Sequence, residues 1–261
     1  MSWIDALILG IVQGLTEFLP VSSSGHLEIG KILLNTNIEE NLIFTVVVHG
    51  ATVLSTVVVF SNEIIKLLRE GLNFHLNEST SYILKIILSF IPVLVIGLLF
   101  EDQVSGLFNE NLLLVGGGLI LTSILLALTS FKITEKKKKI SYLDAFIIGI
   151  AQAVAVIPGL SRSGSTITTG ILLGNKREDV TKFSFLMVLI PVIGINLLDL
   201  LRGDVSDGNG PGIIVLIIGF CASFVSGLFA CKWMINLVKK GNLIYFSIYC
   251  LLLGLTAIIF A

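Results

Sequence analysis

The most regular feature of the chain is the recurrence of long apolar runs separated by short polar segments. Six runs approach the roughly 20 residues that a helix needs to cross the hydrocarbon core of a bilayer. They cover residues 43–60, 82–100, 112–131, 183–201, 212–230 and 243–260. The pattern therefore predicts an all-α polytopic membrane protein with six transmembrane helices.

Two further apolar runs, residues 3–19 and 142–157, are shorter and end at clusters of Pro, Ser and Gly. Pro20 and Pro158 would break a continuing helix, and a second short apolar stretch follows each of them. A re-entrant helix-loop-helix hairpin, which enters the membrane and returns on the same side, is therefore the better interpretation. Non-helical backbone at this depth is tolerated only where protein or a water-filled cavity surrounds it.

The two short runs belong to an internal repeat with a constant offset of 139 residues. The matched positions are Asp5 and Asp144, Gln13 and Gln152, and the segments 22–25 and 161–164. We interpret residues 1–261 as a single membrane domain made of two repeats, about 1–131 and 140–261. Three crossings separate the copies, so the second copy should be inverted and the hairpin tips should meet near the membrane midplane.

Composition and charge agree with this arrangement. The chain is 54% hydrophobic and 13% charged, far from the roughly 25% charged composition of soluble domains. Thirteen of its 17 basic residues fall in segments that the six crossings place on one side, which the positive-inside rule makes cytoplasmic. These segments are 61–81, 132–139, 174–182 and 231–242, whereas the opposite loops 35–41, 101–111 and 202–212 contain Arg202 as their one basic residue.

Other residue classes exclude some functions. The formal charge of −1 and the lack of a concentrated basic face argue against nucleic-acid binding. Three cysteines stand in or beside the last two apolar runs, without metal-ligand spacing, and an odd number cannot form a closed disulfide framework. We interpret Cys221, Cys231 and Cys250 as packing residues.

The first hairpin carries an unusual set of polar residues. Gln13 and Glu17 are four residues apart and share one helix face, and a carboxylate inside the membrane usually marks a functional site. The alternative is that Glu17 merely sits at the interface near the mouth of the hairpin. Three serines and His26 follow in segment 22–26, and a histidine can transfer protons or attack phosphorus near neutral pH.

The second hairpin tip contains Arg162 within a long stretch that is otherwise free of basic residues. A buried guanidinium needs an anion, and its planar fork of donors suits phosphate oxygens. Gly159 and Gly164 allow the backbone to approach a ligand closely beside a helix N-terminus. The tip therefore predicts an anion-binding cradle, although a purely structural pair between Arg162 and Glu17 would explain the same residues.

Residues 13–26 and 158–164 resemble the two motifs of the undecaprenyl-diphosphate phosphatase family associated with bacitracin resistance, and the similarity extends over essentially the whole chain. The resemblance implies hydrolysis of undecaprenyl diphosphate with a divalent cation, Mg2+ or Ca2+, at the bacterial inner membrane, to recycle the lipid carrier for cell-wall synthesis. It implies four catalytic residues, namely Glu17, Ser23, His26 and Arg162. It also implies that Glu17 and Gln13 are the metal ligands. The implied phosphate-binding residues are Ser22, Ser24, Ser161, Arg162, Ser163 and Thr166.

Three positions depart from the family pattern. Many relatives have Glu in place of Gln13 and Gln in place of His49, and they often have Arg where Cys250 follows Tyr249. His49 is accordingly either a second polar contact or an ordinary buried histidine. Whether Ser23, His26 or a water molecule attacks phosphorus stays open at this point.

Other functions fit parts of the pattern. A lipid-carrier flippase or transporter would also use inverted repeats with broken helices at the midplane. A scaffold would have no need for Glu17, His26 and Arg162 at membrane depth. The richer polar content of the first hairpin favours a site that opens outward, and a homodimer is a hypothesis that the sequence leaves open.

Overall fold

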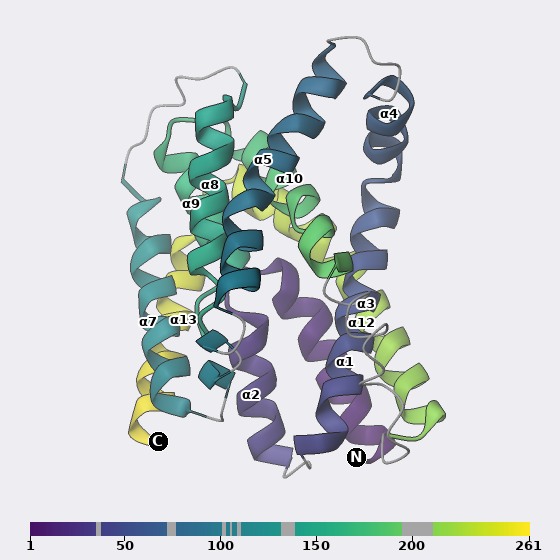
Figure 1. Cartoon of the computed structure of the whole chain (residues 1–261). Helices are drawn as coiled ribbons and strands as arrows, with labels where there is room; N and C mark the ends of the chain where they lie inside the picture. The colour runs from purple at the N-terminus through teal and green to yellow at the C-terminus, as the bar shows by residue number, and fades with distance from the viewer. Residues whose placement is uncertain are drawn as a thin grey trace.

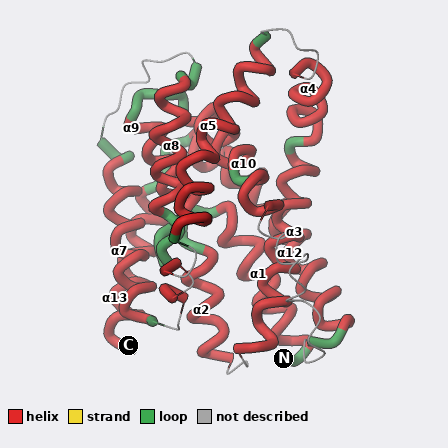
Figure 2. Tube along the Cα trace, viewed as in Figure 1, coloured by secondary structure: helices red, strands yellow, loops and turns green. Residues whose placement is uncertain are grey.

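The protein was studied as a computed structural model, which describes residues 1–34, 38–71, 77–100, 103–104, 106–108, 111–131, 139–194 and 211–261. Side chains of residues 38–42 are also outside the description. The expected outer loops, the end of the run 183–201, and Lys132 and Lys136–Lys138 therefore lie wholly or partly outside it. All regular structure in the described ranges is helical (Figure 2).

The helices follow the order of the apolar runs. They are α1 (Trp3–Phe18), α2 (Ser23–Leu34), α3 (Ile38–Val59), α4 (Ser61–Gly71), α5 (Glu78–Leu99), the 3-10 turn η1 (Gly106–Phe108), α7 (Leu112–Leu128), α8 (Tyr142–Val154), α9 (Arg162–Leu172), α10 (Arg177–Met187), α12 (Ile213–Lys239) and α13 (Ile244–Ile259). Figure 1 shows them as one elongated bundle, with both termini at the same end.

Both short runs form a helix, a loop and a second helix. The same capping box begins each hairpin: Ser2 and Asp5 exchange side-chain and backbone hydrogen bonds at α1, and Ser141 and Asp144 do so at α8. The chain then leaves α1 and α8 in loops that contain a residue with positive φ, Ser22 (69°) or Gly159 (83°). The two loops sit at related places in the repeat, since both immediately precede a helix that begins with a serine cap.

The hairpins enter from opposite ends of the bundle and touch at their tips. In Figure 1, α1 and α2 occupy the half near the N-terminus, and α8 and α9 occupy the other half. The Ser163 hydroxyl donates to the carbonyl oxygen of Leu19 at 3.2 Å, across the contact between the two loops. A side chain at Gly25 would come within 3.4 Å of the Gly159 backbone.

The first helix of each hairpin packs mainly on a helix from the other half of the chain. Helix α1 lies along α12, α8 lies along α5, and α7 pairs with α13. Gly14 makes the first contact possible, because any side chain there would collide with the backbone of Ser223. Gly149 faces the backbone of Ser89 in the same way. The two halves are thus interlocked rather than stacked side by side.

The length and polarity of the helices identify a membrane protein. Helices α5 and α12, with 22 and 27 residues, are long and apolar enough to cross a membrane, and α3 with α4 counts as a third crossing if this pair, bent by 74°, is one span. Helices α7, α8 and α13 are shorter and also apolar. Large apolar side chains cover the outside, as at Leu98 (71% exposed) and Ile259 (76% exposed).

Several boundaries differ from those that the apolar runs predict. Helix α12 continues to Lys239, beyond the expected end at 230, and α5 begins at Glu78 because the Asn77 side chain caps it by accepting from the Thr80 amide. The segment that follows α3 is the separate amphipathic helix α4. Hydrophobicity marks the portion of a helix that suits lipid, while caps and amphipathic turns extend it into the polar zone.

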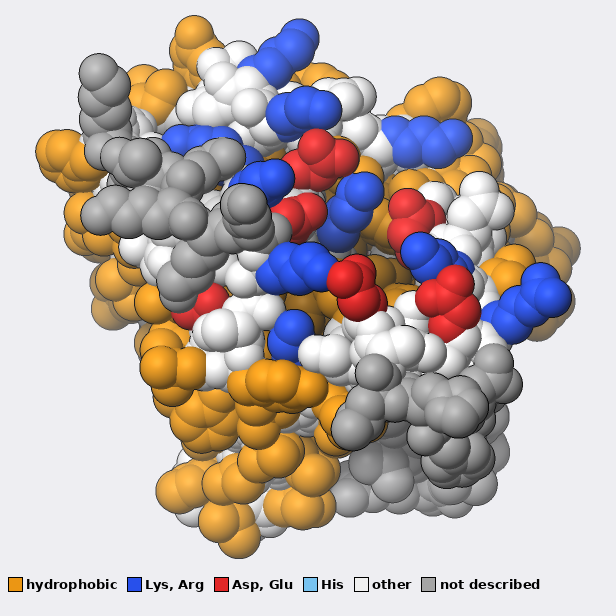
Figure 3. Space-filling view, turned by 90° about the horizontal axis from the view of Figure 1, so that it is seen from above, with side chains coloured by type: hydrophobic (Ala, Val, Ile, Leu, Met, Phe, Trp, Pro, Cys, Tyr) orange, Lys and Arg blue, Asp and Glu red, His pale blue; other side chains and the backbone are white. Residues whose placement is uncertain are grey.

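Charged side chains gather on the end of the bundle at which α4 lies. Figure 3 looks down on this end and shows lysine, arginine, aspartate and glutamate side chains across it, with apolar side chains around its edges. This is the side that the distribution of basic residues predicts to be cytoplasmic.

Candidate functional site

Glu17 is the centre of a polar cluster formed where the two hairpin tips meet. Its side chain is 8% exposed and forms an ion pair with Arg162. The Ser23 hydroxyl donates to Glu17 Oε2 at 2.7 Å, and Gln13 Nε2 donates to the same oxygen at 2.9 Å. The structure thus brings together four of the predicted residues, from α1, α2 and α9. The structural pair between Arg162 and Glu17 that the sequence left as an alternative does form.

Local structure explains why these side chains converge. Ser23 and Arg162 are the first residues of α2 and α9, so the N-termini of both helices lie at the tips. The preceding serines act as caps: Ser22 Oγ accepts from the amide of Gly25 at 3.2 Å, and Ser161 Oγ accepts from that of Gly164 at 3.0 Å. Helix N-termini carry partial positive charge and suit anions.

The other predicted hydroxyls lie around the tips without contacting Glu17. The Ser24 hydroxyl lies 3.3 Å from that of Ser22, and the Ser163 hydroxyl lies 3.3 Å from that of Ser161. The Thr166 hydroxyl donates to the Arg162 carbonyl at 2.9 Å and lies 2.6 Å from the hydroxyl of Ser184. In this conformation these groups shape the two loops, and Ser23 is the serine that reaches the carboxylate.

His26 occupies a separate part of the site. Its Nδ1 lies 2.8 Å from the Ser22 carbonyl oxygen, and its Nε2 lies 2.7 Å from the Tyr249 hydroxyl. Because a carbonyl can only accept, neutral His26 carries its proton on Nδ1 and Nε2 accepts from Tyr249. The structure shows no hydrogen bond or ion pair between His26 and Glu17 among the described residues, so these two predicted catalytic residues are not in direct contact.

Sequence reasoning missed Tyr249. Its ring stacks on the imidazole, with centroids 5.6 Å apart and planes at 11°. The one signal in the sequence is a phenol inside an apolar run, where its hydroxyl needs a hydrogen-bond partner. The neighbouring Cys250 is buried, and its Sγ lies 3.6 Å from the Pro20 carbonyl oxygen, so it packs behind the first hairpin loop.

His49 also reaches the site. Its Nε2 lies 3.9 Å from Glu17 Oε2, and its Nδ1 lies 2.8 Å from the carbonyl oxygen of Thr45 on the preceding turn of α3. The side chain is 26% exposed. The geometry therefore favours the interpretation of His49 as a second polar contact of the carboxylate over that of an ordinary buried histidine.

A narrow recess with an apolar wall begins at the ion pair. Glu17, Arg162, Thr52 and Thr56 line its polar part. The apolar part consists of Phe18, Val53, Phe185, Val188, Leu189 and Val192. The volume is about 10 Å³, which is room for about one water molecule. A larger anion must therefore displace side chains, and the direct partner of Arg162 is Glu17.

Comparison with known proteins places the chain in a family. The sequence model described as bacitracin resistance protein BacA matches residues 6–256. The chain belongs to this family. The undecaprenyl-diphosphatases of Bacteroides fragilis and Parabacteroides distasonis are 52% and 54% identical to it, and each alignment covers 99% of this chain and 98% of the relative. An undecaprenyl-diphosphatase 1 of Bacillus cereus is 36% identical over 97% of this chain and 96% of its own length.

Proposed function

We propose that this protein hydrolyses undecaprenyl diphosphate to undecaprenyl phosphate and inorganic phosphate, which recycles the lipid carrier and confers bacitracin resistance. The names of its full-length relatives support this activity. The observation that carries the proposal within the structure is the Arg162–Glu17 pair, which lies at two helix N-termini and beside an apolar recess. Undecaprenyl diphosphate has a charged head and a long apolar tail, so its site needs a charged surface next to an apolar one.

Binding would exchange the partner of Arg162. In the free protein the guanidinium is neutralised by Glu17, and the diphosphate brings the anionic oxygens that can replace that carboxylate. Amides at the starts of α2 and α9 supply further positive potential. Phosphoryl transfer depends on positioned charge around the transferred group, so Arg162 and the helix termini are the groups that would stabilise the transition state.

The residues present fit a divalent cation whose remaining ligands are phosphate oxygens of the substrate. Gln13 Oε1 is fully buried and accepts no hydrogen bond from any described residue, and Gln13 is already bonded through its other amide atom to Glu17. The described residues contain no group of three or more His, Cys, Asp or Glu that could hold a metal ion alone. Mg2+ is commonly held by one or two carboxylates and by substrate phosphates. Glu17 and Gln13 would hold such a cation, which would neutralise charge on the diphosphate.

The geometry favours Ser23 or water over His26 as the group that attacks phosphorus. Ser23 already donates its proton toward Glu17, as a nucleophile does toward a base. In the overall reaction, the bond from the bridging oxygen to the terminal phosphorus breaks and an oxygen from water bonds to that phosphorus. His26, whose Nε2 faces Tyr249, is placed to manage a proton rather than to attack.

The proposed setting is the bacterial inner membrane, with six crossings and two re-entrant hairpins arranged as inverted repeats. The paired capping boxes, the entry of the hairpins from opposite ends and the contact between their tips support this arrangement. The charged face at the α4 end supports a cytoplasmic orientation for that end (Figure 3). The mouth of the first hairpin then opens outward.

The direct test is phosphate release from a C15 or C55 prenyl diphosphate by purified protein in detergent, with and without Mg2+ or Ca2+. Cation-dependent release that is lost in Arg162→Ala and His26→Ala, and kept in the exposed-residue control Arg69→Ala, is the expected result. No release by well-folded wild-type protein would refute the hydrolase and direct attention to lipid movement in sealed vesicles.

A further inference from the structure

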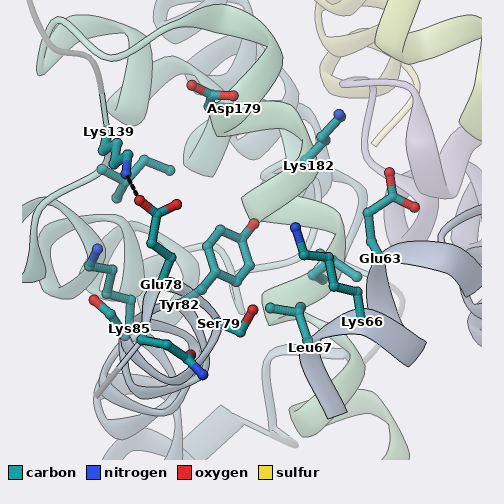
Figure 4. A pocket seen from close by; sticks show the side chains of 14 residues that line it. Glu63, Lys66, Leu67, Glu78, Ser79, Tyr82, Lys85, Lys139, Asp179 and Lys182 are labelled. Atoms are coloured by element: carbon teal, nitrogen blue, oxygen red, sulfur yellow. Dashed lines mark hydrogen bonds and ion pairs between the residues drawn. The ribbon is translucent and has the colours of Figure 1, made fainter. Parts of the chain in front are cut away.

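A second and much larger cavity lies between α4, α5, α10 and the residues just before α8 (Figure 4). Its volume is about 880 Å³, within the range of pockets that bind small organic ligands. It lies toward the charged end of the bundle, and none of its lining residues belongs to the cluster around Glu17. The proposed hydrolysis does not involve this cavity.

Four lysines line the cavity, and they differ in how they are neutralised. Lys139 forms an ion pair with Glu78, which also lines the cavity. Lys85 lies over the ring of Tyr142, 5.1 Å from its centroid. Lys182 lies 3.6 Å from Glu178, a partly exposed pair on one helix face. Lys66 makes no ion pair with any residue in the described ranges, so its ammonium group is available to an anion.

Two carboxylates in the same lining are also unpaired. Glu63 and Asp179 form no ion pair with any part of the chain that the structure describes, and the Tyr82 hydroxyl forms no hydrogen bond there. Figure 4 shows the Lys66 amine and the Tyr82 hydroxyl directed into the space between α4 and α5, with Glu63 to one side and Asp179 across the cavity. The lining therefore offers a cation, a neutral donor and two carboxylates to one occupant.

The walls indicate that this occupant comes from the membrane. Helix α4 turns by 74° from the preceding helix, and its Ile65 and Leu68 are 61% and 52% exposed, as in a helix that lies in the membrane interface. The apolar side chains of Leu67, Ile140 and Leu186 line the cavity together with the charged groups. A phospholipid headgroup likewise combines charged groups with adjoining apolar chains in the membrane interface.

We propose that this cavity binds the headgroup of a membrane phospholipid that carries both a phosphate and a primary ammonium, the phosphoethanolamine class. The phosphate lies at Lys66 and Tyr82, and the ammonium lies at Glu63, on the same helix as Lys66 (Figure 4). A purely anionic headgroup would leave the Glu63 carboxylate without a cation and would be repelled by it. A quaternary ammonium could not donate hydrogen bonds to Glu63. The proposal does not depend on the proposed hydrolysis.

The test is native mass spectrometry of the full-length protein in detergent with equal amounts of phosphatidylethanolamine, phosphatidylcholine and phosphatidylglycerol. Phosphatidylethanolamine should be retained about tenfold more strongly than either of the others. Glu63→Gln should remove this preference, and Lys66→Met should weaken retention of all three lipids about equally, because each of them carries a phosphate. Lys232→Met, which changes an exposed lysine on α12, should alter neither. Helical content by circular dichroism and prenyl-diphosphate hydrolysis should be unchanged in all three variants, which shows that they fold.

Several outcomes would overturn the proposal. Equal retention of the three lipids, or an undiminished preference in Glu63→Gln, would show that the cavity does not select the ammonium of the headgroup. Unchanged retention in Lys66→Met would show that the phosphate does not lie at Lys66. Stronger retention of phosphatidylglycerol would indicate an anion site without a role for Glu63. If millimolar free phosphoethanolamine displaced the bound lipid, the lipid tails would contribute nothing to the affinity. The cavity would then be assigned to a soluble ligand instead.

Discussion

Replacing Arg162 by Met should destabilise the protein far more than replacing both Arg162 and Glu17. The single change leaves the Glu17 carboxylate, 8% exposed, without its cation, and breaking a buried ion pair in this way costs about 3–5 kcal/mol. Arg162 is itself 24% exposed, and Ser23 and Gln13 still donate to the carboxylate, so we expect the lower end, about 3 kcal/mol.

The double variant Arg162→Met with Glu17→Gln removes both charges. An ion pair replaced by neutral groups of similar size is often close to neutral for stability, so most of the loss should return. The coupling energy between the two sites should be about 2–3 kcal/mol, which corresponds to roughly 30- to 150-fold in the unfolding equilibrium. The cycle also needs the single variant Glu17→Gln. Catalytic activity should be lost in both single variants and in the double variant, so the test is the measured stability and not the activity.

The assay is reversible unfolding in mixed micelles of a mild detergent and SDS, followed by far-ultraviolet circular dichroism. Arg69→Met, on the exposed face of α4, is the matched control and should change stability by no more than about 0.5 kcal/mol. If Arg162→Met unfolds like the wild type, or if the double variant is no more stable than Arg162→Met, then Arg162 and Glu17 do not neutralise one another in the folded protein.

Three further changes test other parts of the structure. Tyr249→Phe removes the hydrogen bond to the His26 imidazole and should lower kcat/KM by about 2- to 10-fold in a prenyl-diphosphate assay. Gly159→Ala should destabilise by about 1–3 kcal/mol in the same unfolding assay, because φ is 83° and a side chain would strike backbone, whereas Gly117→Ala meets nothing and should stabilise slightly. The hydrogen bond from Lys239 lowers the pKa of Glu178 below 4.5, so its stabilisation is complete above the unfolded-state pKa and is lost as pH falls through the lower folded value. Lys239→Ala should return that pKa toward its usual range in carboxyl-carbon NMR.

Each of these has a control or a contrary result. Tyr245, 68% exposed on the same helix as Tyr249, can be changed to Phe and should leave kcat/KM unaltered. Equal stability of the Gly159 and Gly117 variants would contradict the role assigned to the positive φ. A Glu178 pKa that does not respond to Lys239 would show that the ion pair at 3.3 Å does not persist in solution.

The sequence predicted the features that short-range patterns encode. Proline and serine clusters after short apolar runs predicted a helix, a loop and a second helix in each repeat, as the structure shows. The repeat at a fixed offset predicted that the two loops would meet, and the contact from Ser163 to Leu19 confirms this, while their re-entry into a membrane stays a prediction. The cost of burying a lone charge predicted that Glu17 and Arg162 need partners, and the two residues supply one another. The roles of these residues in the reaction stay predictions.

Features that depend on long-range packing could not be predicted. The contact between His26 and Tyr249 joins residues 223 positions apart, and no local pattern specifies which phenol on an apolar helix reaches His26. The bend between α3 and α4 depends on how the amphipathic helix α4 packs against α5. The Ser79 hydroxyl of α5 donates to Glu70 Oε2 of α4 at 2.6 Å. The large cavity follows from that bend, so composition alone gave no sign of it.

The interlocking of the two halves has a consequence for synthesis in the cell. Helix α1 packs on α12, which begins about 210 residues later at Ile213. At a translation rate of 5–20 residues per second, the first hairpin must wait roughly 10–40 s for its packing surface. During that interval Gly14 and its helix face have no partner, and Glu17 has no cation until α9 is made. A chain truncated before α12 should therefore be a poor membrane insertion product and a good substrate for quality-control proteases.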